Sequence, residues 1–399
     1  MVAGPSKFLR LQRDLGRIQE ALREADLDGW LLYDLHARNT VTAKLTDLGD
    51  MSRRYFVLLP AHGDPHALVH GIEETPWSNW PWSKERYVGW RQLEEKLRAR
   101  LTGKRVAMEI SEGDGVPAMD LVPAGVLELI RNSGAQVVTS GELVTQFYSV
   151  WTDEELASHR RAAAILMQVA NATFMRIAHA LQAGETVTEA GAQAWVQADL
   201  KARGAGVGGD CIVASTVGAA DPHYAPVGLG APLRAGDLVL LDLWGKEKEE
   251  SVYADQTWMA YLGPVVPDRA RQLFEIIRDG RDAAVTFLQE SWKAKRPVRG
   301  GEVDDVTRGL ITDRGYGHAF IHRTGHSIDQ SVHGMGPNID NLETRDTRVL
   351  IPGVAFSIEP GIYLRGEIGM RTEINVFMNR NGPEVTVAQP QTEIFAVMP

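Results

Sequence analysis

Four carboxylates interrupt apolar runs in the C-terminal part of the chain, and this pattern constrains the fold more than any other feature. Each run otherwise has the composition of a buried β-strand. An ionised carboxylate in such a run costs several kcal/mol unless it is paired or neutralised. The four residues and their runs are Asp242 in "DLVLLDLW", Asp255 in "YADQTWMAYL", Glu359 in "AFSIEPGIYL" and Glu373 in "RTEINVFM". The fold must therefore supply positive charge to these strands.

The sequence around these carboxylates offers little positive charge. Arg371 is the only basic residue within the four runs. A single guanidinium cannot neutralise four carboxylates. Bound metal cations are the simplest compensation.

A histidine-rich stretch, "FIHRTGHSIDQSVHG", supplies candidate nitrogen ligands. His322 and His326 are four residues apart, as in the HExxH helix of zinc proteases, but no Glu follows His322 and Gly325 lies between them. A loop or strand end with one metal-ligating histidine is the better interpretation. One histidine with four carboxylates is a ligand set dominated by hard oxygen. It suits manganese or cobalt at a two-metal site, although affinity alone does not exclude zinc.

Composition excludes several classes of function. The chain has 399 residues, of which 44% are hydrophobic and 24% are charged, which is typical of a globular protein with room for two domains. Its net charge of -10 argues against a nucleic-acid partner and is compatible with a cleft that attracts cations. The single cysteine, Cys211, excludes an internal disulfide and a cysteine-based zinc site.

The hydropathy pattern gives an expectation about location. The N-terminal stretch "MVAGPSKFLRLQRDLGRIQEALREAD" lacks the apolar core of a signal peptide. No apolar run reaches membrane-spanning length. We expect a cytoplasmic protein without a membrane partner.

The first part of the chain is expected to form an α/β domain over residues 1–150. Its predicted elements are an amphipathic helix, the strands "WLLYDL", "RYFVLLP", "HALVH" and "GKRVAMEIS", and the helix "GVLELIRNSG". Between them lies a segment with four tryptophans, Trp77, Trp80, Trp82 and Trp90. These side chains either cover the edge of a core, which is the simpler interpretation, or form an aromatic surface for a partner or ligand.

The second part of the chain shows the same order of elements twice. A capping box at Thr152 and Glu155 predicts a helix, and a second box at Thr186 and Glu189 predicts another that ends near Gly204. Strands follow. After Pro267 the order repeats, with helices predicted over residues 268–289 and 302–314 before the last strands. This repetition suggests two related halves.

Residues 152–399 resemble the pita-bread metallopeptidase family, which includes aminopeptidase P, prolidase, methionine aminopeptidase and creatinase. The motifs that carry the resemblance are "DLVLLDLW", "YADQTW", "HRTGHSI", "SIEPGIY" and "MRTEINV". The preceding part resembles the creatinase/prolidase N-terminal domain. The resemblance implies an α/β (α+β) fold in which this N-terminal domain, residues 1–150, precedes a pseudo-symmetric pita-bread catalytic domain, residues 151–399.

The resemblance also implies a metal site and a reaction. The family's five metal ligands fall on Asp242, Asp255, His326, Glu359 and Glu373, with Asp255 and Glu373 bridging two divalent ions. A hydroxide shared by the ions would hydrolyse the Xaa-Pro imide bond of a dipeptide. Glu359 would take a proton and deliver it to the leaving nitrogen.

Three further histidines match the family's auxiliary catalytic residues. His223 and His333 would donate hydrogen bonds to the substrate carboxylate or to the developing oxyanion. His322 would serve the reaction or support the metal ligands. Arg371 would orient the nearby carboxylate of Glu373.

Several positions depart from the family pattern without removing a ligand. They are Trp244, Trp258, Ser327 and Gly334, and they indicate a distinct subfamily. The expected function is that of an Xaa-Pro dipeptidase, with Xaa-Pro aminopeptidase and a creatinase-like amidohydrolase of non-peptide substrates as alternatives. Creatinase uses no metal, so the intact ligand set argues against the last.

The expected assembly is a homodimer. In resembling enzymes the N-terminal domain of one subunit approaches the active site of its partner. Here the segment from Trp77 to Trp90, or a neighbouring loop, would cap the partner's cleft and restrict the substrate to a dipeptide.

Overall fold

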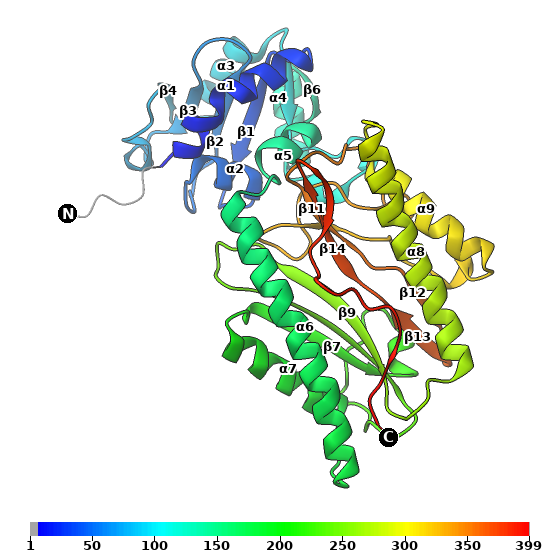
Figure 1. The fold of residues 1–399 in the computed structure, drawn as a ribbon. Helices are drawn as coiled ribbons and strands as arrows, with labels where there is room; N and C mark the ends of the chain where they lie inside the picture. Colours follow the sequence, from blue (N-terminus) through cyan, green and yellow to red (C-terminus); the bar gives the residue numbers. More distant parts are fainter. Residues whose placement is uncertain (1–6, 399) are drawn as a thin grey trace. The chain divides into compact units, whose positions relative to one another are not determined.

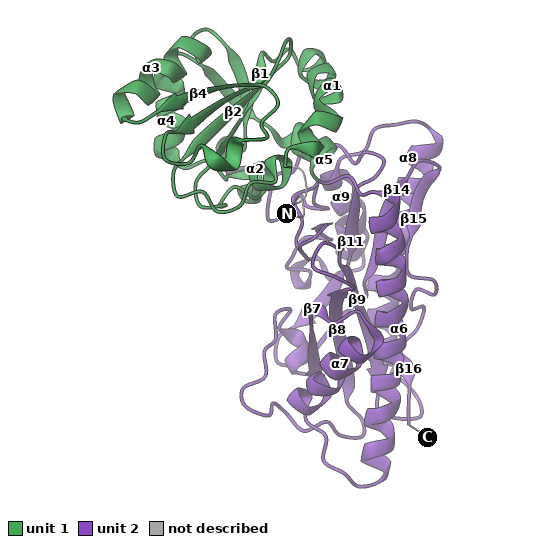
Figure 2. Ribbon diagram, turned by 90° about the vertical axis from the view of Figure 1, so that its left-hand side faces the viewer, with its two compact units in different colours: residues 1–148 green, residues 149–399 purple. Residues whose placement is uncertain are grey.

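A computed structural model describes residues 7–398, and the chain divides into two compact units, residues 1–148 and 149–399 (Figure 2). No helix within the described part of the chain combines the length and apolar character needed to cross a membrane. Each unit has a hydrophobic core of its own. The assignment of the first unit to the creatinase/prolidase type stays a prediction.

The first unit is built on a mixed six-stranded sheet with the order β4-β3-β2-β1-β5-β6 (Figure 1). Its strands are β1 (Gly29–Asp34), β2 (Tyr55–Pro60), β3 (His66–His70), β4 (Ser83–Tyr87), β5 (Arg105–Met108) and β6 (Gln136–Thr139). Its helices are α1 (Leu9–Glu24), α2 (Thr40–Thr46), α3 (Trp90–Leu101), α4 (Ala124–Asn132) and α5 (Gly141–Phe147), with 3₁₀ turns at Thr75–Trp77, Glu112–Asp114 and Pro117–Met119.

The tryptophan-rich segment contributes mainly to the core of this unit. Trp77 and Trp80 are buried, and the Trp77 ring lies 5.6 Å from the ring of Phe8 and 5.5 Å from that of Trp80. Trp82 is half-buried against Trp80. Trp90, in contrast, is 55% exposed. The core interpretation therefore holds for two of the four side chains, and only Trp90 remains available as a surface.

The second unit repeats the order helix, helix, strands. The first half contains α6 (Asp153–Gln182), α7 (Glu189–Arg203), β7 (Val207–Ser215), the 3₁₀ turn Gly218–Ala220, β8 (Leu238–Lys246) and β9 (Ala254–Tyr261). The second half contains α8 (Asp268–Lys293), α9 (Gly300–Asp313), the 3₁₀ turn Gly317–Ala319, β10 (Ser327–Ile328), β11 (Ala355–Ile358), β12 (Gly361–Leu364), β13 (Ile368–Arg371), β14 (Ile374–Asn379), β15 (Gly382–Val385) and β16 (Phe395–Ala396).

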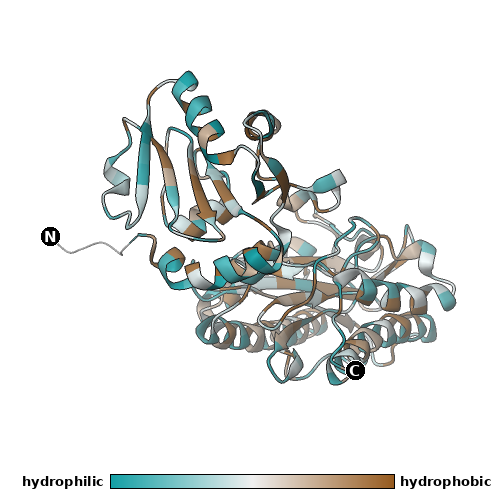
Figure 3. Ribbon diagram, turned by 90° about the horizontal axis from the view of Figure 1, so that it is seen from above, coloured by the Kyte–Doolittle hydropathy of each residue, from teal (hydrophilic) through white to brown (hydrophobic). Residues whose placement is uncertain are grey.

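Two four-stranded sheets, β16-β9-β8-β7 and β10-β11-β14-β15, form the centre of this unit, beside the two-stranded sheet β12-β13. The long helix α6 packs on β8 and β9, and α8 packs on β12, β13 and β15. In Figure 3 the hydrophobic colouring concentrates on the strands and on the helix sides that face them, whereas the outer helix surfaces are hydrophilic. The apolar strands are thus shielded from water, and any charge on them is enclosed.

The helix signals in the sequence are partly correct. The capping box at Thr152 and Glu155 is present and begins α6. The predicted box at Thr186 and Glu189 is wrong, because α7 is capped by Thr188, whose side chain accepts from the backbone N–H of Gly191. Glu189 is the first residue of this helix and its side chain is buried, so it is not available to cap the helix.

Two of the predicted strands are each divided at a carboxylate. "AFSIEPGIYL" forms β11 and β12 with Glu359 between them, and "RTEINVFM" contributes to β13 and β14 with Glu373 between them. Pro360 has no backbone N–H and follows Glu359, which ends the ladder there. At Glu373 the backbone changes partner, and its N–H donates to Thr257 of β9. Both glutamates therefore lie at junctions between strands rather than within them.

Candidate metal centre

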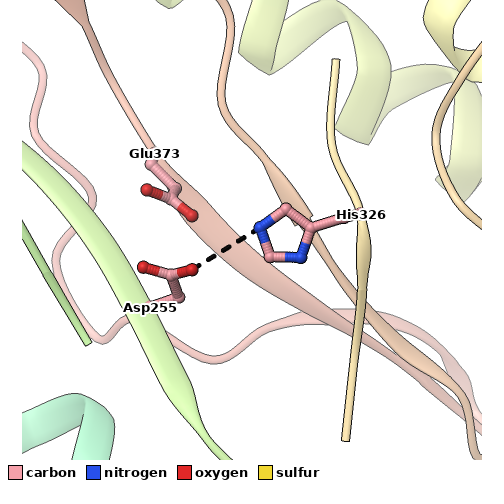
Figure 4. Close-up of side chains that lie close together, drawn as sticks. All are labelled: Asp255, His326 and Glu373. Atoms are coloured by element: carbon pink, nitrogen blue, oxygen red, sulfur yellow. Dashed lines mark ion pairs between the residues drawn. The ribbon is translucent and has the colours of Figure 1, made fainter. Parts of the chain in front are cut away.

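Three buried side chains converge where β9 meets the junction before β14. Asp255, His326 and Glu373 each offer one ligand atom, and these atoms lie within 4.8 Å of one another (Figure 4). Nε2 of His326 is 3.5 Å from Oδ2 of Asp255. Each of the three residues is only 4% exposed. This is the geometry of a cation site made from one imidazole and two carboxylates.

Hydrogen bonds across the seam between the two sheets hold the carboxylates in place. The backbone N–H of Asp255 donates to Oδ1 of Asn375 on β14 at 3.0 Å. In the opposite direction, Oγ1 of Thr257 on β9 donates to Oε2 of Glu373 at 2.8 Å. The seam brings together residues that are more than a hundred positions apart in the sequence.

A close approach to β11 fixes the position of His326. Its backbone N–H donates to Oγ of Ser357 at 2.9 Å, and a Cβ on Gly325 would overlap the carbonyl oxygen of Ser357. Its Nδ1 lies 3.1 Å from the carbonyl oxygen of Ser327. Donation from Nδ1 to this carbonyl leaves the lone pair of Nε2 directed at the carboxylates, as a metal-binding histidine requires.

Glu359 and Asp242 lie at the edge of this cluster and have partners of their own. Oε1 of Glu359 lies 3.3 Å from Nε2 of His326 and accepts from Oγ of Ser357 at 2.9 Å. Asp242 on β8 lies opposite Thr257, so its carboxylate leaves the same face of the sheet as that of Asp255. The five sequence-predicted ligands are thus brought into one neighbourhood.

Arg371 reaches Glu373 through Thr257 rather than by a direct hydrogen bond or ion pair, because Oγ1 of Thr257 accepts from Nε of Arg371 and donates to Oε2 of Glu373. Its Nη2 pairs with Oδ2 of Asp242 at 2.5 Å, and its Nε donates to Oγ1 of Thr257 at 3.0 Å. Nε also lies 3.9 Å from Oε2 of Glu359. Arg371 ends β13, so its side chain points back across β9 to β8 rather than along the chain to Glu373. One guanidinium therefore compensates mainly one carboxylate.

Nearby positive charge does not offset the burial of Asp242, Asp255 and Glu373, and the pKa of each of these carboxylates is raised. Burial, reinforced by Asp255 and Glu359, raises the pKa of Glu373 well above its usual range. Burial also raises the pKa of Asp255, and raises that of Asp242 to about 7 despite Arg371. Burial opposes a charge on His326, but its contact with Asp255 and the charge of Glu359 prevail and raise its pKa. Without another cation, the cluster can reduce its charge only by holding protons.

Two carboxylate oxygens mark where a cation fits. Among the described side chains, Oδ1 of Asp255 and Oε1 of Glu373 are buried without a hydrogen-bond partner. A buried carboxylate oxygen normally accepts at least one hydrogen bond, because losing hydration is costly. Metal coordination satisfies such atoms without any donor from the protein. The donor set of the protein therefore fits divalent cations.

A cavity of about 310 Å³ opens onto this cluster. His326, Glu359 and Arg371 line it, and so do the three predicted auxiliary histidines, His223, His322 and His333. The other lining residues are Asp221, Pro222, Ile321, Arg323 and Glu343. Two of the five candidate ligands, His326 and Glu359, therefore border the same space as the auxiliary histidines.

The auxiliary histidines differ in how they are held. The ring of His333 lies 4.3 Å from that of His326, whereas His223 is exposed on its loop. His322 uses both ring nitrogens, since Nδ1 lies 2.7 Å from the carbonyl oxygen of Arg323 and Nε2 lies 2.8 Å from the hydroxyl of Tyr363. Burial lowers the pKa of His322 to about 4, so the ring is neutral near pH 7. This ring is fixed rather than free to move.

Sequence reasoning missed Tyr363. Its hydroxyl lies 2.8 Å from Nε2 of His322 and accepts from Nη1 of Arg371 at 3.2 Å, which links a cavity histidine to the guanidinium beside Asp242. The available signal was its place in the motif "SIEPGIY", together with Glu359. Nothing local to Tyr363 indicated the contact with His322, which lies 41 residues away.

Comparisons with known proteins agree with this geometry. Residues 157–380 match the sequence profile of metallopeptidase family M24. The chain is 37% identical over 173 residues to an "Xaa-Pro dipeptidase" of Lactobacillus delbrueckii subsp. lactis, with 43% of each chain covered. It is 30% identical over 287 residues to the "Probable dipeptidase PepE" of Mycobacterium tuberculosis, which covers 72% of this chain and 69% of the relative. The similarity to the Lactobacillus relatives spans about two fifths of their length.

Solved structures share the fold. Dipeptidase PepE from Mycobacterium ulcerans superposes with a TM-score of 0.75 at 25% identity, covering 99% of this chain and 100% of that one. A prolidase from Thermococcus sibiricus gives a TM-score of 0.66 at 21% identity, covering 98% and 100%. The predicted α/β fold of the pita-bread type is confirmed.

Proposed function

Because the chain belongs to metallopeptidase family M24, we propose that it is a metal-dependent dipeptidase that hydrolyses the Xaa-Pro imide bond. The observation that carries this proposal is the buried group of Asp255, His326 and Glu373, with two carboxylate oxygens that have no hydrogen-bond partner. Relatives named dipeptidase and Xaa-Pro dipeptidase support the reaction class.

Five side chains would hold the metal. The proposed ligands are Asp242, Asp255, His326, Glu359 and Glu373, and their oxygen-rich composition favours two manganese or cobalt ions, with zinc as the alternative. When bound, such ions polarise the amide carbonyl and lower the pKa of water so that it can act as a nucleophile near neutral pH. The chain's own residues must then place the peptide and transfer the proton.

Glu359 is the residue placed to transfer that proton. Its side chain is 14% exposed and borders the cavity, whereas Asp255 and Glu373 are buried and are not among the lining residues. Burial acts to raise the pKa of Glu359, but His326, His322 and Arg371 outweigh it and lower the pKa below its usual value. The carboxylate is therefore ionised near neutral pH and able to accept a proton before passing it to the prolyl nitrogen.

The auxiliary histidines would bind and orient the peptide. His223 and His333 border the cavity, where their ring N–H groups can donate to a peptide carboxylate or to an oxyanion. His322 is neutral and is held by Tyr363, so it sets the shape of the wall. The ring and the hydroxyl stiffen the cavity on the side next to Arg371.

The size of the cavity supports a small substrate. A volume of about 310 Å³ lies at the lower end of the range of ligand pockets, roughly 300–1,000 Å³. A dipeptide needs only a small pocket of this kind, whereas a longer peptide must extend out of it. The length limit separates a dipeptidase from an Xaa-Pro aminopeptidase.

The test is a comparison of substrates and metals. Chelator-treated protein is assayed with Ala-Pro and Ala-Pro-Ala after addition of manganese, cobalt or zinc. Hydrolysis of Ala-Pro with manganese or cobalt, and little of Ala-Pro-Ala, is the expected result. Preference for the tripeptide would assign an aminopeptidase instead. Hydrolysis of neither peptide would refute the proposal and favour an amidohydrolase of non-peptide substrates.

A further inference from the structure

Each half of the second unit buries a carboxylate near the start of its second helix, outside the candidate metal centre. Glu189 is the first residue of α7, and Asp304 lies in the first half of α9. Both residues have 0% exposure. Burying an ionised carboxylate is costly unless hydrogen bonds replace its hydration. The groups that donate hydrogen bonds to these two carboxylates therefore indicate which parts of the chain they hold in place.

Glu189 receives four hydrogen bonds, all from the segment that ends β7 and continues into the loop carrying His223. Its Oε1 accepts from the N–H and the hydroxyl of Ser215 at 2.9 and 2.8 Å. Its Oε2 accepts from the hydroxyl of Tyr224 at 2.6 Å and from the N–H of Ala231 at 2.7 Å. The start, the middle and the end of the loop are thus tied to one side chain.

The loop is shaped around this carboxylate. Gly230 has a φ of 69°, and a Cβ at this position would lie 2.7 Å from Oε2 of Glu189. A larger residue there would be strained in its backbone and crowded by the carboxylate. His223 immediately precedes Tyr224, so the hydroxyl that Glu189 holds is adjacent in sequence to a cavity-lining histidine.

Asp304 has the same arrangement in the second half. Its Oδ1 accepts from the N–H and the hydroxyl of Thr324 at 3.0 and 2.6 Å, and its Oδ2 accepts from the N–H of Asn341 at 3.1 Å. It also pairs with Arg308 at 2.9 Å, and that guanidinium donates to the carbonyl oxygens of Phe320 and His322. The segment that carries His322 and His326 is therefore tied to α9.

We propose that Glu189 and Asp304 are matched positioning residues: Glu189 sets the place of His223, and Asp304 sets the place of His322 and His326. His223 comes from the first half and His322 and His326 from the second, and in each half one buried carboxylate ties down the segment that carries them. The kinetic consequence rests on the proposed dipeptidase function. The structural consequence, a fixed loop in each half, does not.

An amide cannot replace either carboxylate. Glu189 accepts two donors at each oxygen, whereas a glutamine has one accepting oxygen and a donating NH₂ group. In Glu189→Gln the NH₂ group would therefore face a backbone N–H, that of Ser215 or that of Ala231, which would lose its acceptor, and the neighbouring hydroxyl would have to turn and accept instead of donating. The milder variant Tyr224→Phe removes only one of the four hydrogen bonds and leaves the carboxylate in place.

The first test measures the loops directly, without substrate. Hydrogen exchange is followed in wild-type protein, Glu189→Gln, Tyr224→Phe and Asp304→Asn. We expect exchange across residues 216–231 to accelerate in the two first-half variants, and exchange across residues 320–326 to accelerate only in Asp304→Asn. Bound manganese should fall only in Asp304→Asn, because Thr324 is two residues from His326. Uniform acceleration in every variant would contradict the proposal.

The second test is a double-mutant cycle with His223→Ala on Ala-Pro hydrolysis. If Glu189 acts through His223, Tyr224→Phe and Glu189→Gln should lower kcat/KM by roughly tenfold in the wild-type background but by less than about threefold once His223 is absent. If Glu189→Gln lowers kcat/KM by the same factor with and without His223, the two residues act independently, and Glu189 only stabilises the fold. If wild-type protein does not hydrolyse Ala-Pro, the proposed function is refuted. The exchange and metal measurements would still show whether Glu189 and Asp304 hold their loops in place.

A matched control comes from the same helix. Thr188→Val removes the side-chain cap of α7, the bond to Gly191, without removing an acceptor from the loop. It should lower thermal stability yet show no coupling to His223 and no selective change in exchange across residues 216–231. Coupling as strong as that of Glu189→Gln would show that general loosening of α7 is enough, and would overturn the assignment.

Discussion

Asp242 and Asp255 leave the same face of neighbouring strands, yet they are neutralised in different ways. Asp242 pairs with Arg371 at 2.5 Å. Asp255 lies with Glu373 and His326, and one oxygen of each carboxylate is buried without a hydrogen-bond partner. The chain thus supplies a cation for one carboxylate and leaves the neighbouring pair to a cation from outside.

Whether a buried carboxylate has an internal ion-pair partner affects how strongly it indicates a functional site. A carboxylate with an internal partner is compatible with a structural ion pair, which by itself says little about function. Two neighbouring carboxylates with pKa values raised by burial, each with one oxygen that has no hydrogen-bond partner, are a stronger functional signal. Substitutions can test whether Asp242, which has an arginine partner, differs in role from Asp255 and Glu373, which do not.

The largest expected effect is that of Glu373→Ala. Removing this carboxylate deletes a proposed ligand of both ions, so activity on Ala-Pro and bound manganese should both be lost while the far-UV circular dichroism stays that of the folded protein. The exposed residue Glu367 offers a matched control, and Glu367→Ala should retain both. Full activity of Glu373→Ala, with metal absent from the sample, would contradict the metal centre.

The next largest effect is that of Glu359→Gln. This side chain borders the cavity and is the proposed proton carrier, so turnover should fall by about a hundredfold or more while KM changes little. Steady-state kinetics with metal analysis of the same sample separate proton transfer from ligand loss. A variant that keeps its metal and turns over almost normally would assign the proton transfer to another residue.

Two asparagine substitutions should change stability in opposite directions in metal-free protein at pH 8. Asp242→Asn leaves the buried Arg371 with only the more distant Glu359 as an ion-pair partner, at 3.9 Å. This loss should outweigh the relief of removing a carboxylate whose pKa burial raises to about 7, so we expect the free energy of unfolding to fall. Asp255→Asn removes a charge that lies beside Glu373, so the free energy of unfolding should rise. Urea denaturation measures both. Equal losses in the two variants would mean that the compensated and uncompensated carboxylates do not differ.

The smallest expected effects on catalysis are those of substitutions at the tryptophans of the first unit. Trp77→Ala removes a fully buried ring and should destabilise this unit by about 3–5 kcal/mol, whereas Trp90→Ala should change stability by less than about 0.5 kcal/mol. If the exposed Trp90 helps to cap the cleft of a second subunit, Trp90→Ala should raise the rate on Ala-Pro-Ala relative to Ala-Pro several-fold.

Light scattering tests whether the protein forms the dimer that a cap across subunits requires. The predicted homodimer should be visible at the concentration of the assay. A monomer with unchanged dipeptide selectivity in Trp90→Ala would exclude a cap formed across subunits, and the limit on substrate length would then come from within one chain.

Much of the fold could be predicted from local pattern. Apolar runs gave the strands, and the capping box at Thr152 gave the start of α6, because each signal depends on residues close in sequence. The box predicted at Thr186 failed because Glu189 is recruited by a distant loop. A local motif cannot show that a side chain accepts hydrogen bonds from residues far away in the sequence.

The site could be predicted less completely than the fold. The positions of the carboxylates were visible because each contradicts its apolar surroundings. The sequence did not reveal that Glu359 and Glu373 lie at junctions between strands, because at Glu373 this depends on a backbone hydrogen bond to Thr257 of β9, a distant strand. The pairing of Arg371 with Asp242 depends on how β13 crosses β9 toward β8, which is a matter of three-dimensional arrangement and has no signature in the sequence.

The most direct test of the central claim is a manganese titration of chelator-treated protein, with heat of binding, metal content and Ala-Pro hydrolysis measured on the same samples. If Asp255, His326 and Glu373 form the core of a catalytic two-metal centre, activity should be absent at the start, two ions should bind per chain, and hydrolysis should appear as they bind. Hydrolysis at full rate before manganese is added, or an absence of manganese, cobalt and zinc binding to the folded protein, would contradict it.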